Sequence, residues 1–319
     1  MEVVTKTIIF IGIPFILLLA LRLAGPTDWQ ALVSGIFTGA GDGYHFWPAG
    51  MSLAVFFGAF AYAGAGGNLN LTQSIYIREK GFGMGKYAHK IAGLFRAGGT
   101  NQTVRLSGTP FKHTPHNIAQ FRVWWRKINI EHLSIFWFLG ALAMALLMLL
   151  SYVTAYGHLG NAQGINFVIT EGIAIGGIIT PWVGTLFLFV VSVMLFQTQL
   201  GVMDSTSRIM AENFALWRLG KKAKGAVPLA KMYSFFVWAQ IIFGTILFIF
   251  NISDPKLLLV AGAVINAVAM FVHVGLVNWM NYKELAKPFQ AAVWRKAVML
   301  VIFLFLGFFS ALTLWDKLM

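Results

Sequence analysis

The sequence predicts an all-α polytopic membrane protein with seven transmembrane helices, one of them broken, an inside N-terminus and an outside C-terminus. Two observations predict this class. Hydrophobic residues make up 58% of the 319 residues and charged residues only 11%, whereas soluble domains carry about 25% charged residues. Several apolar runs also reach the length, about 18 residues, at which a helix can span a bilayer.

The apolar runs divide the chain, read as a single transmembrane domain over residues 1–319, into spans and loops. The spans fall at residues 7–24, 46–64, 133–156, 177–200, 232–251, 257–280 and 294–315. The second span is interrupted and continues to residue 77. Residues 77–131 then form one long basic cytoplasmic loop, whose aromatic and basic end is expected at the lipid headgroups.

The net charge of +13 indicates topology rather than nucleic-acid binding. When successive loops are assigned to alternate sides, 21 of the 24 Lys and Arg fall on one side and 3 on the other. The positive-inside rule therefore places the N-terminus in the cytoplasm. Basic loops also attract anionic headgroups, so the predicted partner is membrane lipid and not nucleic acid.

The interruption of the second span is the main functional feature. From Ala63 to Asn70 the chain reads Ala-Gly-Ala-Gly-Gly-Asn-Leu-Asn. Because lipid cannot satisfy exposed backbone groups, a broken helix is tolerated where it is buried or lines a polar cavity, and secondary transporters bind substrate at such breaks. The alternative is a helix that ends at Gly64 and is followed by a loop. In the broken-helix reading, Asn68, Asn70, Thr72 and Gln73 would face lipid in an isolated chain, which predicts association with another chain.

Other polar residues inside the spans leave two readings open. The segment from Gln197 to Arg208 ends the fourth span, and its side chains either hydrogen-bond to neighbouring helices or line a pathway. Within it, Asp204 and Arg208 are four residues apart and are expected to pair. Gln240 is predicted to contact a neighbouring helix. His273, seven residues after Asn266, is either structural or functional.

The remaining side chains favour no enzyme and no bound cofactor. The carboxylates, Glu171 among them, are expected at span ends or in loops, which argues against an intramembrane proton relay and against paired hydrolytic acids. The chain has no cysteine, so thiolate metal sites and disulfides are excluded. His113 and His116 flank Pro115, and they read as interfacial loop histidines rather than as a metal site.

Three segments resemble the Nramp-related divalent metal transporters, in particular the bacterial and archaeal branch: Tyr62–Ser74, Ile77–Gly85 and Gln199–Arg208. The resemblance implies a LeuT-like fold of eleven spans in two inverted five-helix repeats, in a prokaryotic cell (inner) membrane. It aligns the broken helix with the sixth helix of the family and the first span with the fifth. The family's first four helices, including the broken first helix with its Asp-Pro-Gly-Asn motif, would then have to come from a second membrane chain.

The broken helix itself departs from the family pattern. Metal-transporting members carry Met-Pro-His where this chain has Ala63–Gly67, so the soft sulfur and imidazole ligands are replaced. Backbone carbonyls and asparagines remain, which suit a harder cation or none. The candidate site for a transported divalent cation is therefore Ala63, Gly66, Asn68 and Asn70, with Gln197.

Two functions of different classes follow from these patterns. The first is a half or subunit of an Nramp-like secondary transporter for a divalent metal cation, completed by a partner chain. The second is a non-transporting membrane subunit that uses the same fold to scaffold a larger complex. The substituted ligands and the lack of intramembrane carboxylates favour the scaffold, whereas the motifs favour the transporter.

Overall fold

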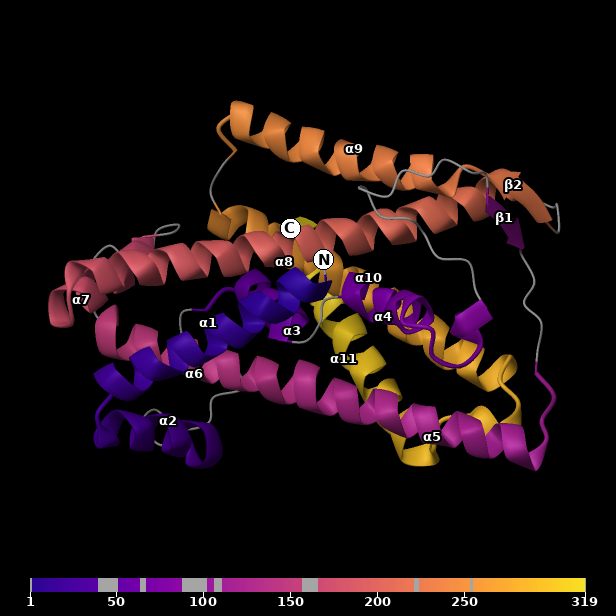
Figure 1. Ribbon diagram of the computed structural model, residues 1–319, viewed down its shortest axis with the longest axis horizontal. Coiled ribbons are helices and arrows are strands. Elements are labelled where there is room, and N and C mark those ends of the chain that lie inside the picture. The colour runs from indigo at the N-terminus through magenta and orange to yellow at the C-terminus, as the bar shows by residue number, and fades with distance from the viewer. Residues whose placement is uncertain are drawn as a thin grey trace. The chain divides into compact units, whose positions relative to one another are not determined.

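A computed structural model describes residues 2–39, 51–63, 67–87, 102–105, 111–156, 166–220, 224–252 and 255–318 of the chain. Helices account for almost all of these residues (Figure 1). Six helices are long and apolar enough to cross a membrane: Val4–Leu23, Pro115–Thr154, Pro181–Leu219, Leu229–Ile249, Leu257–Lys283 and Val293–Trp315. The chain is therefore an integral, multi-pass membrane protein, as its composition predicts.

These six helices coincide with six of the seven predicted spans. The exception is residues 46–64, where the structure describes a helix only over Leu53–Ala63. Eleven residues rise about 16 Å, which is too short to cross the roughly 30 Å hydrocarbon core. Residues 40–50, where the predicted span begins, lie outside the described residues. Seven spans thus remains a prediction.

The described chain divides into two compact units, and the long helices α5 and α8 each contribute to both. The first unit contains α1 (Glu2–Leu23), α2 (Pro26–Thr38), the end of α5 (Pro115–Glu131), the π-helical turn η2 (His132–Phe138), α6 (Leu139–Thr154), α7 (Asn166–Ile178) and the first part of α8 (Pro181–Leu219). Pro26 stands at the first position of α2, where a missing N–H costs nothing. The side chain of Asp28 accepts a 2.8 Å hydrogen bond from the Gly25 N–H at this helix start.

The core of the first unit is built mainly from apolar side chains. It joins α1, α6, α7 and α8 through nine buried side chains: Ile16, Leu19, Ala20, Leu146, Leu149, Leu150, Ile175, Val183 and Phe187. Helices α7 and α8 approach closely in this unit, since Leu188 lies directly against Gly172. Small residues at such crossings let membrane helices pack tightly.

The second unit contains α3 (Leu53–Ala63), α4 (Gly67–Glu79), the 3₁₀ turn η1 (Gly83–Tyr87), β1 (Gln102–Arg105), the start of α5, the second part of α8, β2 (Lys224–Val227), α9 (Leu229–Ile249), most of α10 (Pro255–Lys283), η3 (Lys287–Phe289) and α11 (Val293–Leu318). Its core is aromatic where α3 meets α10 and α11. There the rings of Phe56 and Phe309 lie 5.5 Å apart, and Phe57 and Ala267 are fully buried.

Two features of this unit were not predicted: a pair of short strands and the helix α5. Strands β1 and β2 pair antiparallel, with Gln102 opposite Val227 (Figure 1). Each strand has only four residues, too few to show the apolar alternation that identifies a strand in a sequence. Helix α5 also begins at Pro115 and runs through η2 into α6, so the last part of the segment predicted as a loop over residues 77–131 is helical.

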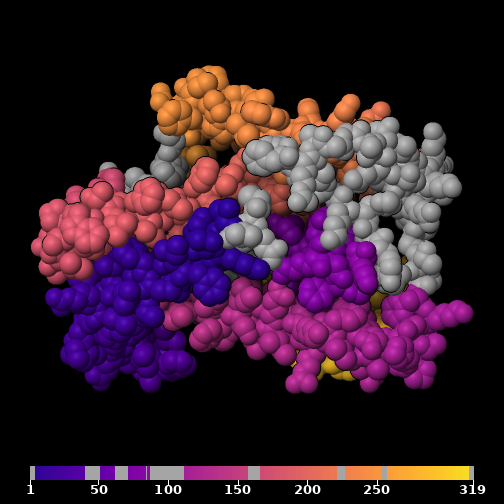
Figure 2. Space-filling view, in the orientation of Figure 1, coloured from indigo at the N-terminus to yellow at the C-terminus, as the bar shows by residue number. Residues whose placement is uncertain are grey.

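The exposed surface of α9 is apolar, as expected of a helix in lipid. Figure 2 shows this helix in orange, and its outward side chains include Phe235, Trp238, Ile242 and Phe243, each more than half exposed. A shallow depression lined by these residues, Ala239 and Ile246 carries no charged group. Lipid acyl chains are therefore expected to cover this surface, as they cover other apolar faces of membrane helices.

The predicted topology can be tested with single cysteines, because the natural chain contains none. A cysteine placed in the 77–131 segment is expected to react with a membrane-impermeant maleimide only after the cytoplasmic face is opened. A cysteine at Met319 is expected to react in intact cells. Labelling of the 77–131 segment in intact cells would contradict both the charge argument and the alignment with the transporter family.

Candidate functional site

The second predicted span consists of two helices on either side of the glycine-rich interruption. Helix α3 ends at Ala63 and α4 begins at Gly67, and residues 64–66 between them lie outside the described residues. The helical structure therefore resumes before Arg78, as predicted. Whereas α3 is strongly apolar, α4 carries two asparagines, Thr72 and Gln73, so polar side chains follow the interruption directly.

The five candidate cation ligands fall in different parts of the structure. Ala63 is the last residue of α3, and Asn68 and Asn70 stand in the first turn of α4. The side chains of these three, and the whole of Gly66, lie outside the described part of the chain. Gln197 belongs to the first unit, where its Nε2 donates a 3.2 Å hydrogen bond to Thr5 Oγ1 of α1. For Gln197 the structure supports the helix-to-helix reading.

The polar side of α4 is not wholly turned toward lipid. Thr72 is completely buried within this chain, which corrects the expectation that it would face lipid in an isolated chain. On α8 of the same unit, Ser205 and Ser207 are also completely buried. Polar side chains of this kind are retained inside membrane proteins where they bond to one another or line a polar interior.

Gln240 adds a hydrogen-bond donor to this polar interior. Its Nε2 donates to Ser207 Oγ at 2.7 Å and lies 3.2 Å from the carbonyl oxygen of Phe236. The predicted contact between Gln240 and a neighbouring helix is therefore confirmed, and it ties α9 to α8. The sequence could identify the lone polar residue, but not the serine on the other helix that accepts its hydrogen bond.

Charged residues at the end of α4 and in the second part of α8, together with one tyrosine of α9, form an ion-pair cluster. Its members are Arg78, Glu79, Asp204, Arg208, Glu212 and Tyr233. Arg208 is its centre. The Nε of Arg208 donates to Asp204 at 3.0 Å, and its Nη1 lies 3.4 Å from Glu79. The side chains of Arg208 and Asp204 are only 12% and 14% exposed. The i,i+4 pair predicted on α8 is thus confirmed.

The rest of the ion-pair cluster joins three helices. Arg78 on α4 pairs with Glu212 on α8. Tyr233 on α9 donates a 2.6 Å hydrogen bond to Asp204, and its ring lies 5.4 Å from the Arg208 guanidinium carbon. Two arginines face three carboxylates, so the positive charges are fully matched. Sequence spacing predicted only the local pair, because Glu79 and Tyr233 come from distant segments.

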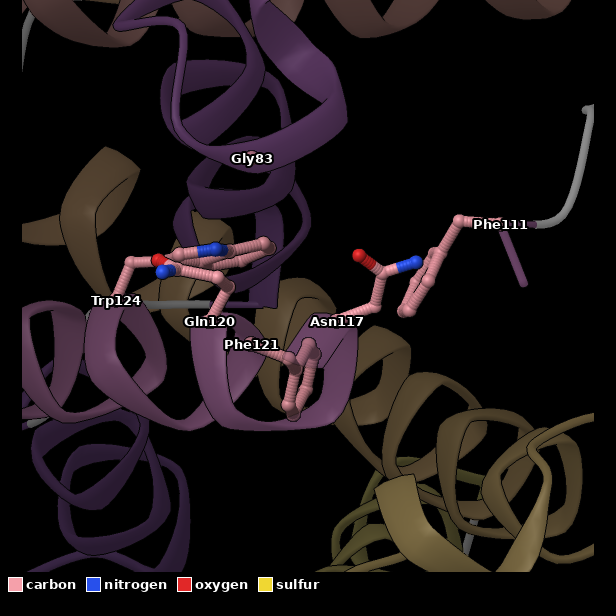
Figure 3. A pocket seen from close by; sticks show the side chains of 6 residues that line it. All are labelled: Gly83, Phe111, Asn117, Gln120, Phe121 and Trp124. Atoms are coloured by element: carbon pink, nitrogen blue, oxygen red, sulfur yellow. The ribbon is translucent and has the colours of Figure 1, made fainter. Parts of the chain in front are cut away.

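A small aromatic depression lies beside η1, the 3₁₀ turn that follows α4. It has a volume of about 280 Å³ and is lined by Gly83, Phe111, Asn117, Gln120, Phe121 and Trp124 (Figure 3). Gly83 has a positive φ of 55°, and a Cβ there would overlap the Trp124 ring. The Asn117 amide donates to the Lys112 carbonyl oxygen at 2.8 Å. Close packing against the Trp124 ring therefore accounts for Gly83, one of the glycines in the segment that resembles the transporter family.

The two histidines of the basic segment lie apart from any carboxylate cluster. The ring of His113 packs 5.8 Å from that of Phe111 and 5.1 Å from that of Phe289. His116 stands in the exposed first turn of α5. Among the described residues, no group of three or more His, Cys, Asp or Glu is placed to hold a metal ion.

One carboxylate was placed wrongly by the sequence analysis. Glu171 was expected at a span end or in a loop, but it lies in the middle of the apolar helix α7 and is only 4% exposed. Apolar length does not identify this helix, because its 13 residues are fewer than a membrane span requires.

No protein-family model, curated protein or solved structure matches the chain. The class that the fold defines is an integral, multi-pass membrane protein of apolar helices. Any narrower assignment depends on the chain's own residues.

Proposed function

We propose that this protein is a half or subunit of an Nramp-like secondary transporter for a divalent metal cation, in a prokaryotic inner membrane. The observation that carries the proposal is the pair of helices α3 and α4, which flank the glycine-rich interruption of an apolar span. Transporters use such interruptions to present backbone carbonyls and helix ends to a substrate. The family-like motifs at Tyr62–Ser74 and Gln199–Arg208 support the same function.

The ion-pair cluster gives this function a second support. It attaches α4, the helix that follows the interruption, to α8 and α9 by charged hydrogen bonds. Hydrogen bonds are stronger in a partly buried, low-dielectric site than in water, and conformational switches often break and re-form such ion pairs. In the proposed transporter, the ion-pair cluster closes the cation pathway at the predicted cytoplasmic end of α4. When the ion pairs break, the cation gains access to the cytoplasm.

The cation expected at this site is a hard one. Carbonyl and amide oxygens are the ligands that remain near Asn68 and Asn70, and oxygen ligands suit Mg²⁺, Ca²⁺ and Mn²⁺. A second membrane chain would supply the helices that correspond to the family's first four, together with further ligands. The five candidate ligands of this chain are uncharged, so a carboxylate from the partner is needed to balance a divalent charge.

A second function, a non-transporting scaffold subunit, is favoured by one specific observation. Gln197, the candidate ligand whose side chain the structure describes, is hydrogen-bonded to Thr5 of a neighbouring helix. A side chain used in this way stabilises a helix bundle and does not coordinate an ion. In the scaffold, the ion-pair cluster is a permanent brace between helices.

One experiment separates the two functions. The chain is extracted from native membranes in a mild detergent, its native mass is measured, and the same material is reconstituted into vesicles loaded with a divalent-cation indicator. We expect a mass above 35.2 kDa and uptake of Mg²⁺, Ca²⁺ or Mn²⁺ that falls at least tenfold in N70L. The matched control is N213L, since Asn213 is exposed on α8. A larger mass without uptake would support the scaffold function instead. A monomer that transports the cation would show that no partner chain is needed.

A further inference from the structure

Glu171 is buried, and one of its carboxyl oxygens has no hydrogen-bond partner among the described residues. Its side chain is only 4% exposed, and its Oε1 is fully buried with no donor within reach. It stands one helical turn before Ile175, so both side chains lie on the same face of α7. Because Ile175 is completely buried in the apolar core of the first unit, the Glu171 carboxyl faces that core as well.

The described residues that surround Glu171 offer no positive charge. Helix α7 packs against α6, which has no charged residue from Leu139 to Thr154. It also packs against the start of α8, which has none from Pro181 to Gly201. Among the titratable residues of these segments, Tyr152 is half exposed. On α1 and α2, which complete this core, Lys6 and Arg22 are exposed and Asp28 is bonded to Gly25.

An ionised carboxylate is costly in such surroundings, and the cost is several kcal/mol when no partner compensates it. Helix α7 is too short to be a membrane span, and burial alone raises the pKa of the Glu171 carboxyl from 4.5 to about 7. The neutral acid is therefore the form that fits the packed hairpin of α7 and α8.

We propose that the Glu171 carboxyl is a proton-binding site, and that its ionisation loosens the packing of α7 against α6 and α8. A proton is the ligand that fits this site, because it binds to a single carboxylate oxygen and needs no further ligand. A metal cation needs several oxygen or nitrogen ligands, and the apolar surroundings of Glu171 provide none among the described residues. The proposal is independent of the transport function, since it rests on the first unit alone.

Chemical labelling tests the proton site directly. The apolar reagent dicyclohexylcarbodiimide adds to a protonated carboxyl in an apolar environment and gives an N-acylurea with no leaving group. On the full chain in detergent, we expect labelling of the peptide that contains Glu171 at pH 6, detected by mass spectrometry. Labelling is expected to fall about tenfold for each pH unit above the pKa. E171Q removes the label, whereas E131Q, which removes a partly exposed carboxylate at the end of α5, leaves it unchanged.

Thermal unfolding tests the link between ionisation and packing. The folded carboxyl keeps its proton up to about pH 7, while the unfolded one loses it near 4.5. Between these values the folded state binds more protons, so stability falls as pH rises through this window. The midpoint of the natural chain is expected to drop by several degrees from pH 5 to pH 7.5, and E171Q to lack this drop.

Two results would overturn the proposal. One is a Glu171 peptide that stays unlabelled at pH 6 or is labelled equally at pH 6 and pH 9. The other is an E171Q midpoint that falls with pH in parallel with the natural chain. If E171Q does not fold, the labelling profile of the natural chain still decides the question.

Discussion

Replacing Arg208 with methionine is expected to lower the free energy of unfolding by about 3 kcal/mol, because it leaves partly buried carboxylates without their cation. Asp204 keeps the hydrogen bond from the Tyr233 hydroxyl but loses its cation, and Glu79 loses its contact across to α8. Methionine retains the length and apolar contacts of the arginine stem. Unfolding in mixed detergent micelles, followed by tryptophan fluorescence, measures the change.

The control for this substitution lies on the same helix. R218M removes an exposed arginine near the end of α8, and a change within about 0.5 kcal/mol is expected there. Combining D204N with R208M should recover part of the loss, since the carboxylate left unpaired is then neutral. Equal stability of R208M and R218M would show that the ion-pair cluster contributes nothing to the fold.

The same substitution bears on the proposed function. If the ion-pair cluster closes the cytoplasmic end of α4, R208M should alter cation uptake at temperatures where it remains folded. If the cluster is a permanent brace, R208M should change stability alone. Comparing both readouts on one variant therefore distinguishes the transporter from the scaffold.

Much of the fold could be predicted because composition and the length of apolar runs identify membrane helices directly. Six spans were located from apolar length alone, and the pairing of Asp204 with Arg208 followed from helical spacing. Contacts between distant segments could not be predicted. Neither Glu79 beside Arg208 nor Ser207 beside Gln240 has a sequence signal, because both depend on how separate helices pack.

The length criterion that found the spans also concealed α7. This apolar helix of 13 residues is taken for part of a loop when only runs long enough to cross the bilayer are counted. For the same reason Glu171 was expected at a span end or in a loop, whereas it is buried in the middle of α7. A signal was available, since Asn166–Ile178 contains one charged residue among apolar and small ones, and apolar helices shorter than a span are buried in protein or lie at the interface.

The hairpin of α7 and α8 depends on the absence of a side chain at Gly184. A Cβ at this position would overlap the carbonyl oxygen of Gly172 and lie 2.9 Å from the backbone nitrogen of Gly176. Backbone atoms cannot move aside as a side-chain tip can, so α7 must shift as a whole. G184A is therefore expected to lower the free energy of unfolding by about 2–3 kcal/mol, the upper range for an overpacked site.

Two further glycines of α7 provide a graded control. At Gly172 a Cβ would meet only the Leu188 side chain, at 2.7 Å, and at Gly177 it would meet nothing within 4 Å. G172A should cost less than G184A because leucine can change rotamer. G177A should be neutral or stabilise the helix by up to about 1 kcal/mol, since alanine is the better helix former.

Because α7 carries Glu171, G184A should also open the carboxyl to water and reduce its labelling by the carbodiimide at pH 6, whereas G177A should not. Equal unfolding free energies for G184A and G177A would show that α7 does not pack on α8 in the membrane, and the apolar surroundings of Glu171 would then lose their basis.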